Sequence, residues 1–241
     1  MRQRRQEVTV ELRSRGDGRH AAAGAGIALG SGPLEQAEGV TITVADAPAL
    51  LAIFALRGLE PCDALVDARA DAFESSAAAS WSPEGCPGAL LVGALAAATA
   101  RTRVSTHHHE AVVGTTIRDG IAYVAAAGGA GAFVLRRGVL HDVTPAATSA
   151  YRDRRWCQYT IHEHDRLILT CDSVRRAIQP GLLRRVVMAS AALDAACERL
   201  LEATPGKGAA ALVATFDGHL PHANAKDEFD CHVPASSEDE R

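Results

Sequence analysis

Lysine, aromatic residues and long apolar runs are all scarce in this chain of 241 residues. Only Lys207 and Lys226 are lysines, so arginine carries nearly all of the positive charge, and the formal net charge is −4 at pH 7. This balance gives no electrostatic footprint for nucleic acid or for an anionic membrane surface. The longest apolar run, Ala89–Ala100, is too short to span a bilayer and predicts a buried helix instead.

We expect no export signal, and the cysteines form no closely spaced pair. The basic start Met1–Arg5 is not followed closely by the apolar stretch of a signal peptide. None of the six cysteines belongs to a Cys-x-x-Cys pattern. We therefore expect a cytoplasmic protein whose cysteines are reduced thiols.

The remaining composition, 47% hydrophobic and 22% charged residues, is that of an ordinary globular chain with a full core. Apolar periodicity predicts strands at Glu7–Leu12, Ala22–Gly32, Val40–Val44, Trp156–His162, Arg166–Thr170 and Ala210–Phe216. It predicts helices at Ala47–Arg57, Ala64–Ser80, Ala89–Thr102 and Pro180–Ala203. This order is not an alternating βαβ pattern, so we expect one α+β domain over residues 1–218. Residues 219–241 form a polar tail whose tip we expect to be disordered.

The stretch Gly114–Val143 carries the most specific local pattern. Asp119-Gly120, Gly128-Gly129 and Arg137-Gly138 are turn signals that separate short apolar runs at even spacing. The pattern predicts a continuous antiparallel meander.

The order of these pieces resembles the metal-dependent type 2C protein serine/threonine phosphatases. The middle strands of that family carry Gly-Thr-Thr, Gly-Asp-Ser-Arg and Arg-x-Gly, and later Gly-Asp-Arg-Leu-Leu-Leu-x-Ser-Asp-Gly. Gly114-Thr115-Thr116, Arg136-Arg137-Gly138 and much of His164–Asp172 match these letters. The resemblance covers about Glu7–Phe216. It implies a four-layer αββα sandwich of two antiparallel sheets flanked by helices.

The resemblance also implies which residues form the site. Arg19 falls on the phosphate-binding arginine of the family. Asp46 and Asp172 fall on two of its metal aspartates, and Ala47 on a residue that offers a carbonyl. Two manganese or magnesium ions would activate a bridging water and clamp the phosphoryl oxygens. We expect the carboxylates of Asp46 and Asp172 to lie near each other, within reach of one ion.

Several catalytic letters of the family are missing. Ala21–Gly24 stands in place of Asn-Asn-Glu-Asp, and Gly128–Gly131 in place of Gly-Asp-Ser-Arg. The final Asp-Asn falls on Gly208–Ala210, which has no carboxylate. Because two aspartates balance only half the charge of two divalent ions, we expect the manganese or magnesium site to be weak or absent.

Each candidate also has a structural interpretation. Arg19 suits a solvated surface, Asp46 suits the N-cap of a following helix, and Asp172 suits the cap of a short helix at Ser173–Ala177. His107–Glu110 predicts a solvated loop. The two histidines of His162-Glu163-His164 would share one strand face, but no third metal ligand is evident.

Three functions are compatible with this pattern. The first is a weakly active or inactive pseudophosphatase that binds a phosphoprotein or a regulatory protein partner. The second is an active phosphoserine/phosphothreonine hydrolase with a reduced metal site. The third, an N-terminal-nucleophile hydrolase, requires cleavage before Thr115 to free the amine, and the intact chain disfavours it. None of the three calls for a nucleic acid or a membrane.

Overall fold

The computed structural model describes residues 5–13, 20–28, 37–46, 49–58, 63–80, 82, 84–100, 109–145, 156–204, 209–217 and 230–232. Side chains are described only from residue 50 onward. Arg19 and Ala47 therefore lie outside the described residues, as does the side chain of Asp46.

Two six-stranded sheets face each other, and every pair of neighbouring strands is antiparallel. Sheet A runs in the order β1 (Arg5–Arg13), β2 (His20–Ala28), β11 (Ala209–Asp217), β10 (Arg166–Thr170), β7 (Gly131–Arg136) and β8 (Val139–Asp142). Sheet B runs in the order β12 (Asp230–His232), β9 (Trp156–Thr160), β6 (Ile121–Ala127), β5 (His109–Arg118), β4 (Ala49–Gly58) and β3 (Ala37–Asp46).

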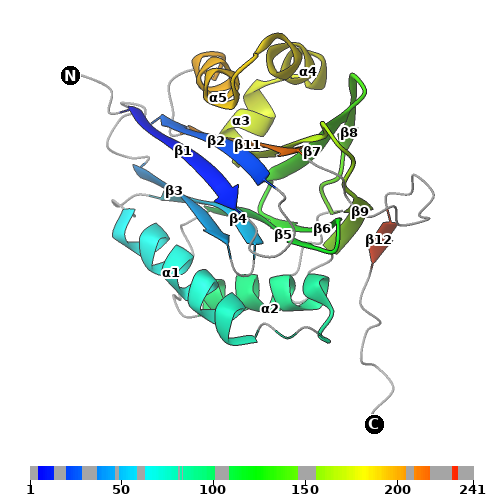
Figure 1. The fold of residues 1–241 in the computed structure, drawn as a ribbon. Coiled ribbons are helices and arrows are strands. Elements are labelled where there is room, and N and C mark those ends of the chain that lie inside the picture. Colours follow the sequence, from blue (N-terminus) through cyan, green and yellow to red (C-terminus); the bar gives the residue numbers. More distant parts are fainter. Residues whose placement is uncertain are drawn as a thin grey trace.

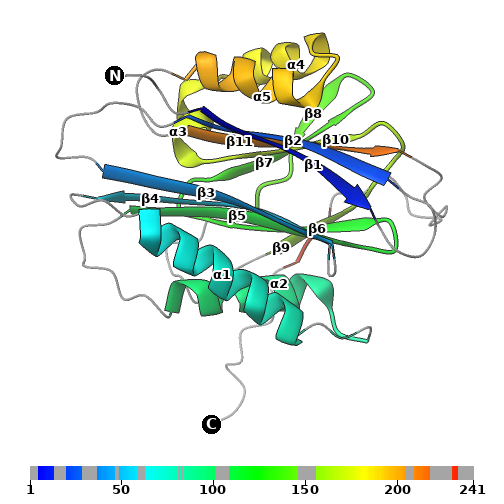
Figure 2. The same cartoon turned by 60° about the vertical axis from the view of Figure 1, so that its left-hand side comes forward.

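Helices cover both outer faces of the sandwich (Figures 1 and 2). Sheet B is covered by α1 (Asp63–Ser80) and α2 (Pro87–Ala100). Sheet A is covered by α3 (Asp172–Ala177), α4 (Pro180–Ala189) and α5 (Leu193–Glu202). The expected four-layer αββα sandwich is confirmed. None of the helices in the described part of the chain is long and apolar enough to cross a bilayer.

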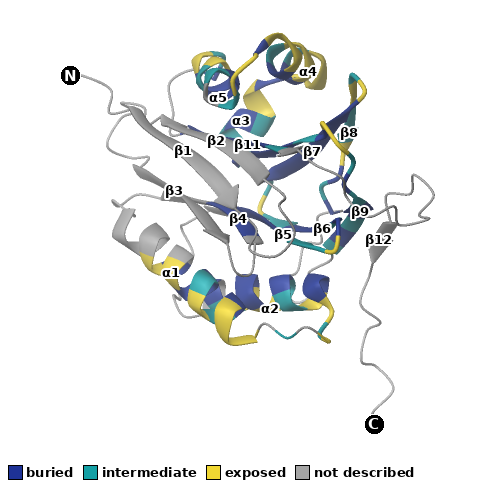
Figure 3. Cartoon of the chain, in the orientation of Figure 1, coloured by how far each residue is buried: buried dark blue, intermediate teal, exposed yellow. Residues whose placement is uncertain are grey.

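The predicted helix at Ala47–Arg57 is wrong, because this stretch is strand β4. Leu51 and Ile53 pack in the main core, whereas Leu50 and Ala52 pack in the cluster beneath α1 and α2. Residues 50–53 are thus buried on both faces of the strand, and the stretch reads as one apolar run, which periodicity alone does not separate from a helix. Figure 3 shows the described part of β4 as buried.

The turns of the glycine-rich stretch are confirmed, but the single continuous meander is wrong. Asp119-Gly120 and Arg137-Gly138 have positive φ at both residues, the backbone of tight hairpins. They join β5 to β6 and β7 to β8. Gly128-Gly129, at φ 68° and 92°, instead carries the chain from sheet B to sheet A.

The long helix predicted at Pro180–Ala203 is also wrong, since α4 ends at Ala189 and α5 begins at Leu193. The end of α4 is held by side chains that satisfy its free carbonyls. Arg166 donates from Nη1 to the carbonyls of Val187 and Ser190, and the Ser190 hydroxyl donates to the carbonyl of Val186.

Two further features correct or extend the expectations. Cys157 on β9 is disulfide-bonded, so the cysteines are not all reduced thiols, and Cys231 of β12 lies opposite it in the strand register. Such bonds are typical of oxidising compartments, which weighs against a cytoplasmic location. Strand β12 itself lies within the stretch predicted to be a polar tail.

Candidate functional site

Asp172 lies at one end of sheet A, where β10 passes directly into α3. It is the first residue of that helix, after the N-cap position held by Cys171, so its interpretation as a cap is wrong. Its carboxylate pairs with the guanidinium of Arg176 one turn later in the helix. A carboxylate in the first turn also interacts favourably with the helix dipole. The charge of Asp172 is therefore already balanced within α3.

The Gly128-Gly129 turn lies directly against this carboxylate. A Cβ atom built on Gly129 would lie 2.6 Å from Oδ1 of Asp172, and the φ of Gly129 is 92°. Both facts favour glycine, because an L side chain would clash there and strain the backbone. The turn thus approaches Asp172 with backbone alone, at the position where the resembled family carries an aspartate.

The start of β11 forms a third side of this end. The Cys171 amide donates to the Ala210 carbonyl at 3.1 Å, and the Ala210 amide contacts Cys171 Sγ at 3.2 Å. Ala209 and Ala210 are both buried. The stretch that matches the family's final Asp-Asn is therefore beside Asp172, as the resemblance implies, but it brings only alanine.

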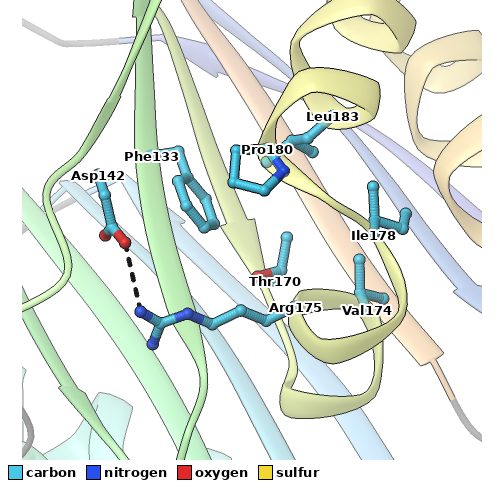
Figure 4. Close-up of a pocket in the computed structure, with 8 residues that line it drawn as sticks. All are labelled: Phe133, Asp142, Thr170, Val174, Arg175, Ile178, Pro180 and Leu183. Carbon is cyan, nitrogen blue, oxygen red and sulfur yellow. Dashed lines mark hydrogen bonds and ion pairs between the residues drawn. The ribbon is translucent and has the colours of Figure 1, made fainter.

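Arg175 points toward Asp142 (Figure 4) and lies beside Gly131, the position that matches the arginine of the family's Gly-Asp-Ser-Arg. A Cβ on Gly131 would lie 2.8 Å from Cδ of Arg175. The Arg175 guanidinium donates to the Ala130 carbonyl at 3.0 Å and to Asp142 at 3.3 Å, and it lies 6.0 Å from the centre of the Phe133 ring. Sequence reasoning missed Arg175 because its role follows only from its position in space.

The pocket next to Arg175 is small. It has a volume of about 100 Å³, and its walls include Phe133, Thr170, Val174 and Leu183. Pockets for small molecules are usually about 300–1,000 Å³. The described residues here therefore do not enclose a phosphorylated side chain.

Asp46 is at the other end of the sandwich. Ala127, the residue before the Gly128-Gly129 turn, aligns through Val112 and Phe54 with Thr41 of β3. Asp46 lies five residues further along β3, which is roughly 17 Å at the usual rise of a strand. The register thus argues against an ion shared by Asp46 and Asp172, although the Asp46 carboxylate itself lies outside the described residues. Its interpretation as a helix cap is wrong, because strand β4 follows.

The histidines in the described part of the chain form no metal centre either. β9 ends at Thr160, so His162 and His164 lie in a turn, and His164 has a φ of 67°. Within the described residues, no group of three or more His, Cys, Asp or Glu side chains could hold a metal ion. Of His107–Glu110, the last two residues begin β5 and the first two lie outside the described residues.

The residues that match the family motifs make contacts that stabilise the fold. Arg136 and Asp165 form a buried two-pronged ion pair, with Nε–Oδ1 at 3.1 Å and Nη2–Oδ2 at 2.7 Å. Arg136 also donates to the Thr160 carbonyl at 2.5 Å, and Asp165 accepts from the His162 amide at 2.9 Å. The Thr115 hydroxyl donates to the Tyr123 carbonyl at 2.8 Å.

Buried tyrosines accompany these contacts. Burial, reinforced by the negative charge of Asp165, raises the pKa of Tyr159 far above its usual value. Burial also raises the pKa of Tyr123. Both rings stay neutral wherever the chain is folded at ordinary pH.

Solved structures that superpose on this chain include type 2C serine/threonine phosphatases. PppA, described as a key regulatory component of the T6SS in Pseudomonas aeruginosa, superposes with a TM-score of 0.65 at 16% identity, covering 86% of this chain and 100% of PppA. The catalytic domain of the phosphatase PstP, bound to two manganese ions, superposes with a TM-score of 0.62 at 12% identity, covering 90% and 99% of the two chains. The chain has the type 2C phosphatase fold.

A second structure of PstP, from Mycobacterium tuberculosis, gives a TM-score of 0.60 at 12% identity. Identities this low establish the fold alone. Neither a protein-family model nor a curated protein sequence matches the chain.

Proposed function

We propose that this protein is a regulatory pseudophosphatase of type 2C architecture, which binds a phosphoprotein or a regulatory protein partner and hydrolyses phosphate esters weakly or not at all. The observation that carries the proposal is the pairing of Asp172 with Arg176 against a turn made only of glycine. A guanidinium of the chain itself occupies the role that a metal cation would otherwise fill beside this carboxylate.

The described residues do not fit a two-ion manganese or magnesium centre. Both ions need several hard oxygen ligands, mostly carboxylates. The described carboxylates at this end are Asp172 and Asp142, and both are already paired with arginines. The turn at Gly129 and the start of β11 add no carboxylate. We therefore derive no metal-dependent step for this chain.

Two findings favour a binding role over a purely structural one. This chain superposes on almost the full length of PppA and PstP, although its own site lacks the metal-binding carboxylates of the family. PppA is itself described as a regulatory component. In the proposal, Arg19 remains the predicted phosphate contact, through charge-assisted hydrogen bonds. The cytoplasmic location stays a prediction, and thiol counting on protein alkylated before lysis would test it, because the Cys157 disulfide is typical of oxidising compartments.

Steady-state turnover of p-nitrophenyl phosphate, with and without manganese, tests the proposal. The wild-type protein, Asp172→Asn and the matched control Asp142→Asn are compared after purification in a chelator. We expect background rates in all three, whether or not manganese is present. Manganese-dependent turnover that is abolished by Asp172→Asn and retained by Asp142→Asn would show a working phosphatase with a reduced metal site.

A further inference from the structure

The end of sheet A opposite Asp172 contains a larger hollow, of about 600 Å³. It lies between the β7–β8 turn, the turn that follows β9 and the last residues of α4. The strand register places it there: Arg166 and Leu135 pair at this end, whereas Thr170 and Gly131 pair at the Asp172 end. We call it the arginine-rimmed hollow, and its lining includes Arg136, Arg137, His162, Asp165, Arg166 and Met188.

The walls of the hollow are tied to one another in the folded chain. The Arg136–Asp165 pair joins β7 to the turn before β10. Arg166 is fixed to the end of α4 through the Val187 and Ser190 carbonyls. From α4, Arg184 donates to the Gly138 carbonyl of the β7–β8 turn at 2.5 Å. A ligand would therefore meet a preformed surface and order little of the protein on binding.

The hollow and its rim carry an excess of positive charge. Arg137 is exposed and makes no hydrogen bond or ion pair among the described residues. Arg166 uses only Nη1, which leaves its other donors without a described acceptor. The carboxylate of Asp165 is already bonded to Arg136 and to the His162 amide. The other carboxylate in the lining belongs to Glu163, which is exposed. This local excess contrasts with the net charge of −4 on the whole chain.

An apolar element lies beside these charges. Val139 and Met188, 55% and 51% exposed, are the exposed large hydrophobic residues of the described part of the chain. They flank the same turn, since Val139 follows Gly138 and a Cβ on Gly138 would lie 3.6 Å from Met188 Cε. β8 is also the last strand in the order of sheet A (Figure 3). Exposed apolar residues at a sheet edge are typical of surfaces that receive an extended segment.

We propose that the arginine-rimmed hollow is a docking site for an extended acidic segment of a partner protein. Carboxylates of the segment bind Arg137 and Arg166, and an apolar side chain packs on Met188 and Val139. The combination favours an acidic peptide over a nucleic acid, because a polyanion alone would not use the apolar residues and the chain as a whole is acidic. This site is at the opposite end from Asp172 and stands whether or not the protein hydrolyses phosphate.

The probe is a synthetic peptide that alternates glutamate and valine over seven residues, labelled with fluorescein and titrated with the full chain. The expected result is saturable binding that weakens as salt rises. A peptide with glutamine in place of glutamate should bind at least tenfold more weakly. Arg137→Gln should weaken binding about tenfold, because a charge-assisted contact is lost. Met188→Ser should weaken it about fivefold through lost apolar contact.

Arg176→Gln, a matched loss of an exposed arginine at the other end, serves as the control and should leave the affinity unchanged. Circular dichroism melting of each variant separates lost binding from lost folding, and Arg137 makes no described contact whose loss would unfold the chain. Equal affinity for the glutamate and glutamine peptides would overturn the proposal. So would equal weakening by Arg137→Gln and Arg176→Gln, or tighter binding of a single-stranded oligonucleotide than of the peptide.

Discussion

The two ends of sheet A each place an aspartate against an arginine, but the two pairs are built differently. Arg136 and Asp165 are buried and joined by two parallel contacts, with further bonds to backbone groups. Asp172 and Arg176 form a partly exposed pair within one helix, with side-chain exposures of 27% and 63%. The first pair uses letters that match the phosphatase family, and the second sits where the family's metal ligands are missing.

This difference shows which parts of the resemblance reflect folding and which reflect chemistry. A buried pair holds its elements together, and removing one partner leaves a buried charge. A solvated helix pair contributes little stability, so its residues are free to change when chemistry no longer constrains them. The chain can therefore retain the fold and lack the ligand set.

Removing one carboxylate at each end should give the largest contrast. Asp165→Ala leaves the buried Arg136 guanidinium without its carboxylate partner, so we expect a loss of about 3–5 kcal/mol in the free energy of unfolding. Asp172→Ala should cost no more than about 1 kcal/mol, because its partner remains solvated. Urea unfolding followed by circular dichroism measures both. Equal losses at the two ends would refute the contrast.

Adding a methyl group at Gly129 should sharpen the account of the Asp172 end. Gly129→Ala introduces a Cβ 2.6 Å from the Asp172 carboxylate at a φ of 92°, so we expect a loss of about 1–3 kcal/mol. The double variant Gly129→Ala/Asp172→Ala removes the clash and keeps the backbone strain. In a double-mutant cycle measured in urea, the double variant should therefore lose less stability than the sum of the two single losses. Strict additivity would mean that the turn does not press on Asp172.

Alkaline pH should act on the Asp165 end through Tyr159. Its pKa is raised in the folded protein, so the unfolded chain ionises first, near pH 10. Stability is then complete below about pH 10 and falls as the pH rises further, by up to about 1.4 kcal/mol per unit for this group. Thermal melting between pH 9 and pH 11 measures the slope. Tyr159→Phe should flatten it, and an unchanged slope would assign the loss to other groups.

Freeing the Asp172 carboxylate should have the smallest effect. Arg176→Gln removes its partner, yet one free carboxylate is too few oxygen ligands for a divalent ion. We expect manganese affinity, measured by isothermal titration calorimetry, to stay weaker than about 1 mM and to change no more than about threefold, by analogy with weak single-ligand sites. Binding in the micromolar range would reveal ligands at this end beyond Asp172.

Much of the fold could be predicted because its signals are local. The hairpins at Asp119-Gly120 and Arg137-Gly138 need positive φ, and the glycine in each pair indicates such a turn directly from the sequence. Helices α1 and α2 followed from composition and length. Of the site, Asp172 was placed correctly after β10, and the stretches at Gly129 and Ala210 meet it as the resemblance implies.

The errors arise where burial or contacts with distant segments, and not the local pattern, decide the structure. β4 packs on both faces, so its apolar run carries no period that distinguishes strand from helix. The break between α4 and α5 depends on Arg166, which reaches the carbonyls of Val187 and Ser190 from another strand. Asp46 matched a motif by its letters, but the β3–β4 register puts it at the other end of sheet B.

The sequence by itself therefore determined the turns, most of the strands and the loss of the family's carboxylates, because each depends on residue types at or next to the position concerned. The tertiary structure alone decided which sheet receives β7, which arginine neutralises Asp172, and how Arg137, Arg166 and Met188 gather around one hollow. These features are contacts between segments far apart in the chain. They form only when the two sheets pack against each other, and no local pattern of residues encodes them.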